Sequence, residues 1–329
     1  MDPARSIAVV IPSWNSARLL SRCLDSIAAQ DVEVELLVVD NGSSDGSLQL
    51  LEERGVEHIA LPRNTGFAVA VNLGVARVRA AAVLVLNADT VLEPGCVRAL
   101  AEGLFSDPGL GGVQPRILQL DEGRRSDVDE ARVYSAGMAL TADGRAVEEG
   151  AGGPQGPLSA APREIFGVCG AACLLRRQLF DGLGGYDERY FAFYEDVDLN
   201  VRARIAGWSF AYVPEAVVWH LGNASWMAGA PRPSAWNARL VARNRIATQA
   251  KFIPARTLPR ILAVELGALA RAARQRRFRA TLRGKLEGLH RLPEMLRERR
   301  RLGRDGDLGR ARDWLSRDGG GAAPAPRGR

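Results

Sequence analysis

The 329-residue chain has few cysteines and no long apolar run. Its four cysteines are scattered, whereas a disulfide scaffold carries more of them in a shorter chain, so a reducing compartment is expected. The longest apolar stretches, at 80–86 and 261–264, fall far short of the roughly 20 residues that a membrane span needs. No basic leader followed by an apolar run opens the chain, so we expect a cytoplasmic location.

Two common nucleotide-binding motifs are also missing. A dinucleotide-binding fold needs G-x-G-x-x-G after its first strand so that the backbone can approach a pyrophosphate, but here the apolar run 7–11 leads into Pro12-Ser13-Trp14-Asn15. No G-x-x-x-x-G-K-[ST] loop occurs either. The first absence counts heavily against NAD-binding and FAD-binding proteins, and the second excludes P-loop NTPases. A content of 47% hydrophobic and 25% charged residues excludes a mainly disordered or fibrous chain.

The first ninety residues alternate between two kinds of pattern. Apolar runs of strand length occur at 7–11, 36–39, 56–61 and 82–86, and helical periodicity occurs at 16–29, 47–54 and 67–79. Strands that are apolar on both faces and separated by helices indicate an α/β fold, with a mostly parallel central sheet and helices on both faces. Such sheets bind ligands at the carboxyl ends of their strands. Polar residues cluster at those ends, at 12–15, 40–45, 63–66 and 87–89.

Charge divides the chain into two parts. Residues 239–313 contain 21 Lys and Arg against seven Asp and Glu, a net charge of +14, whereas residues 1–238 have a net charge of −10. The basic part has a helical pattern, and its positive charge suggests attraction to an anionic partner. Between the two ordered patterns, residues 121–163 are rich in Gly, Pro and charge and predict a surface insertion or a flexible lid. Residues 317–329 predict a disordered tail.

Two groups near the predicted strand ends have two interpretations each: Asp40, and Asn87 together with Asp89. A carboxylate such as Asp40 can accept a hydrogen bond from an N–H of a pyrimidine base, or it can merely shape a turn. Asn87 and Asp89 lie two residues apart, and such hard oxygen ligands suit Mg²⁺ or Mn²⁺, although a lone Asn-x-Asp is more often a turn. From the residues alone, both pairs of interpretations stay open.

The densest group of acids is Glu195, Asp196 and Asp198, which follows an aromatic run at 190–194. Closely spaced acids shift each other's pKa, so that one can act as a general base, but the helix macrodipole also stabilises acids at a helix start. The aromatic side chains could form a wall around a sugar or an ordinary core. His220 follows an apolar strand and is either a packed residue or a metal ligand together with an acid.

The order of these motifs is more specific than any one of them. The chain has VVIPSWN at 9–15, VVDNGSSDGS at 38–47, NTGF at 64–67, LVLNADT at 84–90, an E-D pair within 191–198, and Trp219-His220. In this order they resemble the family 2 glycosyltransferases, most closely the bacterial rhamnosyltransferase-like branch, over about residues 6–252. The resemblance implies a GT-A fold and the transfer of a sugar, with inversion, from a nucleoside diphosphate donor.

The resemblance also implies roles for individual residues at the donor site. Those expected to border the nucleotide, its base, the diphosphate or the donor sugar are Pro12, Ser13, Asn15, Asp40, Asn64, Gly66 and Asn72. Asp89 matches the last Asp of the family's D-x-D motif and His220 its later metal-site histidine, so a divalent cation, Mg²⁺ or Mn²⁺, is the expected cofactor. Asn87 stands where the first Asp of that motif would lie. It can still orient a ribose hydroxyl or a metal-bound water, but the site has one negative charge less and its metal affinity is expected to be modest.

Asp196 matches the second acid of the family's E-D pair, which is its catalytic base. Inversion in one displacement needs a base opposite the leaving group, and a metal-bound diphosphate replaces the general acid of glycosidases. One carboxylate base is then enough, so Glu195 and Asp198 are expected to position the acceptor and the base. We further expect Asp196 and Asp89 to face one cavity with room for a hexose.

The expected donor is dTDP-rhamnose first and a UDP-hexose second, because Asp40 could pair with either pyrimidine. The expected acceptor is a hydroxyl of a glycan or of a lipid-linked sugar. The alternative is a non-catalytic relative that binds a nucleotide sugar or a glycan. The presence of Asp89, Asp196 and His220 argues against that alternative.

The expected domains follow from the extent of the resemblance. They are a catalytic domain at 1–252, with a nucleotide-binding half at about 1–115, the insertion at 121–163 and an acceptor half at 164–252, then a basic helical extension at 253–316 and the tail.

The basic extension has three possible partners. Ile261, Leu262, Leu266 and Leu269 form an apolar stripe that passes into an Arg-rich stretch. The favoured hypothesis is peripheral contact with an anionic membrane, where a lipid-linked acceptor would reside. Helices packed on the catalytic domain with a solvated Arg face are an equally strong interpretation. Nucleic acid is an unlikely partner because, beyond Phe278, no aromatic residues are interleaved with the basic ones.

Overall fold

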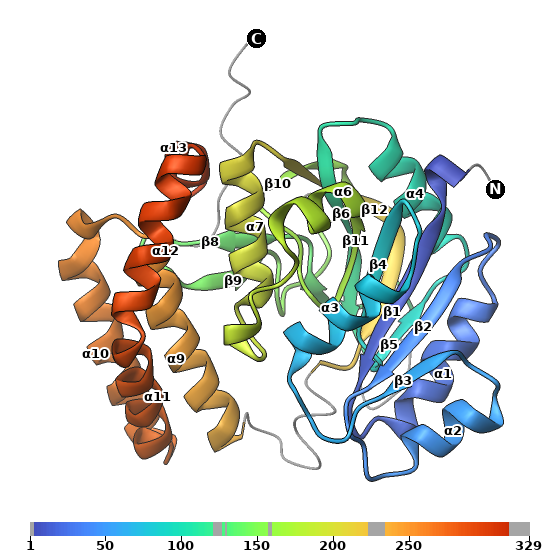
Figure 1. Cartoon of the computed structure of the whole chain (residues 1–329), viewed down its shortest axis with the longest axis horizontal. Coiled ribbons are helices and arrows are strands. Elements are labelled where there is room, and N and C mark those ends of the chain that lie inside the picture. Colours follow the sequence, from blue (N-terminus) through green and yellow to red (C-terminus); the bar gives the residue numbers. More distant parts are fainter. Residues whose placement is uncertain (1–2, 121–126, 129, 157–159, 223–233, 316–329) are drawn as a thin grey trace.

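The computed structural model describes residues 3–120, 127–128, 130–156, 160–222 and 234–315. Its central sheet has the strand order β10-β12-β6-β11-β4-β1-β2-β3, with β5 beside β12 and β7 beside β6 (Figure 1). The strands are β1 (Ile7–Ser13), β2 (Glu35–Asp40), β3 (His58–Ala60), β4 (Ala82–Leu86), β5 (Thr90–Leu92), β6 (Leu110–Gln119), β7 (Val133–Ser135), β10 (Arg163–Ile165), β11 (Ala172–Arg176) and β12 (Ser209–His220). The pairs β1–β2, β1–β4, β2–β3 and β6–β12 are parallel, whereas β11 runs antiparallel to β4 and β6. The predicted α/β fold with a mostly parallel central sheet is confirmed.

Helices cover both faces of this sheet (Figure 1). They are α1 (Ala17–Ala28), α2 (Ser47–Glu53), α3 (Phe67–Arg77), α4 (Cys96–Phe105), α6 (Arg177–Leu183) and α7 (Glu195–Ala206). Successive residues of a strand point to opposite faces, so Val9 and Ile11 of β1 join the core formed with α1 and α4. Ala8 and Val10 join the core formed with α3, α6 and α7. The parallel strands β1, β2 and β4 end at a common carboxyl edge of the sheet. The predicted polar clusters lie at this edge.

The segment expected to be a surface insertion or flexible lid, residues 121–163, differs from that expectation in the part that is described. Its β7 extends the sheet beside β6, and β8 (Met138–Leu140) and β9 (Ala146–Glu148) form an antiparallel hairpin. Met138 and Leu140 are buried in a core shared with α7. Strands of three residues are too short to give a readable hydrophobic period, which is why the sequence did not predict them.

The C-terminal part is helical as far as it is described. It consists of α9 (Ala235–Phe252), η3 (Ala255–Thr257), α10 (Leu258–Arg274), α11 (Phe278–His290), α12 (Leu292–Asp305) and α13 (Leu308–Arg312). Buried Lys251 on α9 places its Nζ 2.5 Å from Oδ1 of Asp198 on α7 and 3.1 Å from Oδ2 of Asp187, which ties the two helices together. Figure 1 shows α10, α11 and α12 on the side of the molecule opposite β3. The predicted tail, residues 317–329, lies outside the described residues.

Candidate active site

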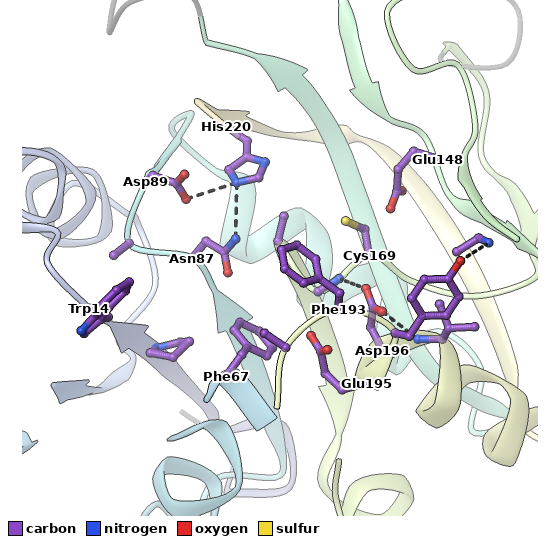
Figure 2. Close-up of a pocket in the computed structure, with 18 of the residues that line it drawn as sticks. Trp14, Phe67, Asn87, Asp89, Glu148, Cys169, Phe193, Glu195, Asp196 and His220 are labelled. Atoms are coloured by element: carbon purple, nitrogen blue, oxygen red, sulfur yellow. Dashed lines mark hydrogen bonds and ion pairs between the residues drawn. The ribbon is translucent and has the colours of Figure 1, made fainter. Parts of the chain in front are cut away.

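A cavity of about 250 Å³ opens at the carboxyl ends of β1 and β4 (Figure 2). Eight of the residues singled out from the sequence line it, namely Pro12, Ser13, Asn64, Asn87, Asp89, Glu195, Asp196 and His220. Asp89 and Asp196 therefore face the same cavity, on walls built from distant parts of the chain. Figure 2 shows Asn87, Asp89 and His220 together on one side and Glu195 and Asp196 on another.

The Asp89–His220 pair is assembled by strand pairing. Asp89 lies in the turn between β4 and β5, and His220 ends β12, which pairs with β5 so that His220 is opposite Thr90. His220 Nε2 lies 3.1 Å from Oδ1 of Asp89 and 3.3 Å from Nδ2 of Asn87. Both Asp89 and His220 are buried, and Nδ1 of His220 has no hydrogen-bond partner among the described residues.

These side chains fit a divalent cation that takes most of its ligands from elsewhere. Neighbouring ligands of an octahedral ion with bonds of about 2.1 Å are separated by about 3 Å, close to the Asp89–His220 distance. Within the part of the chain that the structure describes, no group of three His, Cys, Asp or Glu side chains gathers at metal-binding spacing. The described residues would therefore supply one carboxylate and one imidazole to the cation. Diphosphate oxygens and water would supply its remaining ligands.

The acidic pair begins α7. The carboxylate of Asp196 accepts hydrogen bonds from the backbone N–H of Gly170 (3.0 Å, to Oδ2) and of Val197 (2.8 Å, to Oδ1). Burial raises the pKa of Asp196, and these two N–H groups oppose that rise because they stabilise the ionised form. Burial, and next the charge of Asp196, raise the pKa of Glu195 well above its usual range, and one buried oxygen of Glu195 has no partner among the described residues.

These environments assign different protonation states to the two acids. Because two adjacent carboxyl groups do not both ionise easily, the pair releases its protons in two steps. Asp196, with two N–H donors on its carboxylate, is the better-stabilised anion, and Glu195 keeps its proton to higher pH. Asp198, expected to help position the acceptor, does not line the cavity, because its carboxylate pairs with Arg202 (2.6 Å) and Lys251 (2.5 Å).

The loop at residues 190–194, which leads into the Glu195–Asp196 pair, has a strained backbone that is held by hydrogen bonds from Asn244. Phe191, Phe193 and Tyr194 have φ angles of 68°, 67° and 73°, a region that non-glycine residues rarely occupy. The amide nitrogen of buried Asn244, on α9, donates to the carbonyl oxygens of Tyr190 (2.9 Å), Ala192 (2.9 Å) and Phe193 (2.7 Å). This clamp holds the conformation that presents Phe193 to the cavity.

Two buried oxygens lie at the carboxyl ends of β1 and β2. Ser13 and Asp40 are register partners on β1 and β2, and both side chains are buried. Oδ2 of Asp40 accepts a hydrogen bond from the N–H of Ser43 (3.1 Å). Oδ1 of Asp40 and Oγ of Ser13 have no hydrogen-bond partner among the described residues. Because buried polar atoms are normally paired, these two are places where a ligand donor would fit.

Asp40 does not line the cavity, and neither do the predicted residues Asn15, Gly66 and Asn72. Each of these three residues contacts another part of the protein instead. Oδ1 of Asn15 accepts a hydrogen bond from the turn that follows β2 (2.8 Å). Gly66 has a φ of 97°, and a Cβ there would lie 2.6 Å from the carbonyl oxygen of Phe191. The amide of Asn72 exchanges two hydrogen bonds of 2.9 Å with the backbone of Tyr186. These bonds join α3 to the backbone at Tyr186, and the place of Asn72 beside the diphosphate stays a prediction.

Sequence reasoning gives no individual role to several other lining residues, namely Trp14, Phe67, Tyr134, Glu148, Cys169 and Phe193. Trp14 and Phe67 lie within the quoted motifs and could have been found there. Tyr134 packs edge-on against His220, with 4.4 Å between ring centroids. Tyr134 and Glu148 come from the segment without periodicity, so no sequence signal marks them.

Comparisons with known proteins bear on the family and the fold of the chain. A family model described as "Glycosyltransferase like family 2" matches residues 3–246. The N-acetylglucosaminyl-diphospho-decaprenol L-rhamnosyltransferase of Mycobacterium tuberculosis (strain ATCC 25618 / H37Rv) is 31% identical over 240 residues, which cover 65% of this chain and 75% of that protein. An N-acetylglucosaminyltransferase of Mesorhizobium japonicum is 30% identical over 231 residues, 66% of this chain and 51% of that protein.

Solved structures share the fold. GalNAc-T7 with UDP, GalNAc and Mn²⁺ has a TM-score of 0.59 at 17% identity, over 75% of this chain and 48% of that one. The mannosyltransferase PcManGT from Pyrobaculum calidifontis, in complex with GDP-Man and Mn²⁺, has a TM-score of 0.52 at 18% identity. The match covers 90% of this chain and 84% of that one. The fold predicted from the sequence is thus confirmed as GT-A. The chain belongs to the family 2 glycosyltransferases and is a glycosyltransferase with the GT-A fold.

Proposed function

We propose that this glycosyltransferase moves a sugar from a nucleoside diphosphate donor to a hydroxyl of a glycan or lipid-linked acceptor, with inversion at the anomeric carbon. One observation carries the proposal: the Asp89–His220 pair and the Glu195–Asp196 pair line the same cavity (Figure 2). Single-displacement transfer needs a charge-stabilising group at the leaving diphosphate and a base on the opposite side of the sugar. A cavity with these two groups on different walls supports that chemistry.

Asp196 is the proposed base. Its carboxylate would take the acceptor hydroxyl proton as the hydroxyl oxygen bonds to the anomeric carbon and the bond from that carbon to the diphosphate breaks. Protonated Glu195 adds no second negative charge beside the base and can donate a hydrogen bond to the acceptor. A divalent cation, Mg²⁺ or Mn²⁺, bound by Asp89 and His220 would neutralise charge on the departing diphosphate. Mn²⁺ in the GalNAc-T7 and PcManGT structures supports this choice.

The donor is proposed to be dTDP-rhamnose first and a UDP-hexose second. The unpaired oxygens of Ser13 and Asp40 support a nucleoside at this edge, and Asp40 could accept a hydrogen bond from the ring N–H of either pyrimidine. The similarity to an enzyme named as a rhamnosyltransferase acting on N-acetylglucosaminyl-diphospho-decaprenol supports a rhamnosyl donor and a lipid-linked acceptor.

The reaction can be tested directly. The protein is incubated with dTDP-rhamnose or with a UDP-hexose, Mn²⁺, and N-acetylglucosaminyl diphosphate carrying a short prenyl chain. Mass spectrometry is expected to detect one added deoxyhexose with dTDP-rhamnose, or one added hexose if the donor is a UDP-hexose. Thermal unfolding should show donor-dependent stabilisation that EDTA reduces. Donor-dependent stabilisation without product, over a panel of donors and acceptors, would instead indicate a non-catalytic nucleotide-sugar-binding relative.

We also propose that α10 lies against an anionic membrane surface. Leu258, Leu262 and Leu266 repeat every four residues on one face of α10, and their exposed fractions are 53%, 54% and 67%. Of the nine exposed large hydrophobic side chains among the described residues, seven belong to α10, α11 and α12, so this surface is unlike the rest of the protein. Exposed Arg271 and Arg274 follow on the last turn of α10. An apolar helix face beside exposed arginines suits the interface of an anionic bilayer.

Of the predicted stripe, Leu262 and Leu266 are exposed, whereas Leu269 is partly exposed and Ile261 packs against the core that includes α7. The exposed leucines favour membrane contact over the alternative in which α10 buries its whole apolar stripe on the catalytic domain. No described helix is long and apolar enough to cross a membrane. The double variant Leu262→Ser/Leu266→Ser is expected to lose flotation with phosphatidylglycerol vesicles, which the wild type retains, while neither protein floats with phosphatidylcholine alone. Leu73→Ser changes a leucine that is 40% exposed outside this surface and is the matched control. Equal flotation of the double variant and the wild type would refute the proposal.

A further inference from the structure

The carboxyl group of Glu148 lines the cavity, but it has no role in the mechanism proposed above. It ends β9 and faces the cavity from the hairpin side (Figure 2). A chain of hydrogen bonds fixes it: its Oε2 accepts from Oγ of Ser135 (2.5 Å), and that Oγ accepts from Nε2 of Gln114 (2.8 Å). Oε1 of the same glutamine accepts from the backbone N–H of Cys169 (2.7 Å). The position of the carboxyl group is therefore set by a buried network and not by solvent.

The same short segment anchors the proposed base. Cys169 is followed by Gly170, whose N–H is 3.0 Å from Oδ2 of Asp196. Figure 2 shows Glu148 and Asp196 on the same side of the cavity, with the Cys169 thiol between them. Burial, then the charges of Glu148 and Asp196, raise the pKa of that thiol. An acceptor whose hydroxyl reaches Asp196 would therefore have Glu148 on the same side of the cavity.

Unlike the next residue in the sequence, Glu148 has no ion pair among the described residues. The adjacent Glu149 forms an ion pair with Arg163 (2.7 Å), which fastens the hairpin to β10. Burial raises the pKa of Glu148 to about 7, and the charge of Asp196 adds to this effect, while the Ser135 hydrogen bond opposes it. A carboxyl group that is part neutral near pH 7 can both donate to and accept from a sugar hydroxyl.

We propose that the Glu148 carboxyl group binds a hydroxyl of the acceptor sugar that neighbours the hydroxyl facing Asp196. This inference rests on the proposed transfer reaction and narrows its acceptor class to sugars with two neighbouring hydroxyl groups. Glu148 then selects which hydroxyl of the acceptor is brought to the base, so it determines acceptor specificity.

The test pairs protein variants with acceptors that lack one hydroxyl. Transfer from dTDP-rhamnose is measured for the wild type, Glu148→Ala, Glu148→Gln and the matched control Glu149→Gln. The acceptors are prenyl-linked N-acetylglucosaminyl diphosphate and its single-deoxy analogues. For one analogue that still reacts, wild-type kcat/KM is expected to fall roughly 10- to 100-fold. Glu148→Ala should show a similar loss on the full acceptor but no further loss on that analogue. Glu149→Gln, which weakens the hairpin but keeps the Glu148 carboxyl group, should retain the wild-type ratio of kcat/KM between the two acceptors.

Other outcomes overturn the inference in distinguishable ways. Equal losses for the wild type and for Glu148→Ala on every reactive analogue would show that no hydroxyl is coupled to Glu148. If Glu148→Gln lost transfer to every acceptor while retaining its thermal stability and donor affinity, Glu148 would act on the reacting atoms and not on a neighbouring hydroxyl. A wild type that transfers no sugar from any donor would defeat the proposed function, and this inference with it.

Discussion

Replacing Asn244 with alanine is expected to destabilise the protein and slow transfer together. The substitution removes the amide that donates to the carbonyl oxygens of Tyr190, Ala192 and Phe193. The Tyr190 oxygen keeps a hydrogen bond from Nη2 of Arg243 (2.6 Å), so the carbonyl groups of Ala192 and Phe193 lose the donor. At about 1–3 kcal/mol for each carbonyl group left without it, the free energy of unfolding should fall by about 2–6 kcal/mol.

The effect on transfer follows from the strain in the same loop. Phe193 and Tyr194 occupy positive φ angles that each cost roughly 1–3 kcal/mol, so without the clamp the loop is expected to relax and α7 to lose its fixed start. Equilibrium urea unfolding measures the stability loss, and kcat measures the loss of positioning. The control Thr248→Val removes one hydrogen bond to the Tyr190 hydroxyl (3.1 Å) and should cost about 1 kcal/mol. An Asn244→Ala protein as stable as this control, with full kcat, would refute the reasoning.

Three further predictions concern the cation and the base. Asp89→Asn should weaken Mn²⁺-dependent donor binding at least about tenfold, seen by titrating the thermal shift with Mn²⁺, and unchanged Mn²⁺ dependence would remove Asp89 from the cation site. Asn87→Asp, which adds a carboxylate beside His220, should lower the Mn²⁺ concentration needed for half-maximal transfer, and a higher requirement would contradict the proposed site. Because the pKa of Asp196 is raised, kcat/KM should fall as the pH drops through a value above the usual range for Asp. An acid limb at about pH 4 or below would contradict this.

The sheet and its first helices could be predicted from sequence because their patterns are long and regular. Every predicted strand and helix up to residue 86 ends within two residues of its observed bounds. The carboxyl-edge rule then placed Pro12, Ser13 and Asn87 at the cavity without any contact information. Asp89 and His220 are different, since only the order of the motifs linked them. Their contact depends on the pairing of β5 with β12, which no local pattern encodes.

The rest of the site could not be predicted because it depends on tertiary contacts between distant or weakly patterned segments. Glu148 lies in a strand of three residues, which shows no period. Asn72 and Asp198 have suitable chemistry and lie near the motifs, but a sequence does not reveal which partner a polar side chain faces. Asn72 bonds to the backbone of Tyr186, and Asp198 bonds to Lys251 as well as to nearby Arg202. Tyr186 lies more than 50 positions from Asn72, and Lys251 lies more than 50 positions from Asp198.

The proton acceptor is the central claim of this account, and Asp196→Asn tests it most directly. Donor affinity and the rate of sugar transfer are measured side by side for this variant and the wild type. Because the cation site lies on another wall of the cavity, donor affinity in the presence of Mn²⁺ should stay within about twofold, whereas kcat should fall by about 10²- to 10⁴-fold, the usual contribution of a general base. Transfer within tenfold of the wild-type rate would contradict the assignment of Asp196 as the base.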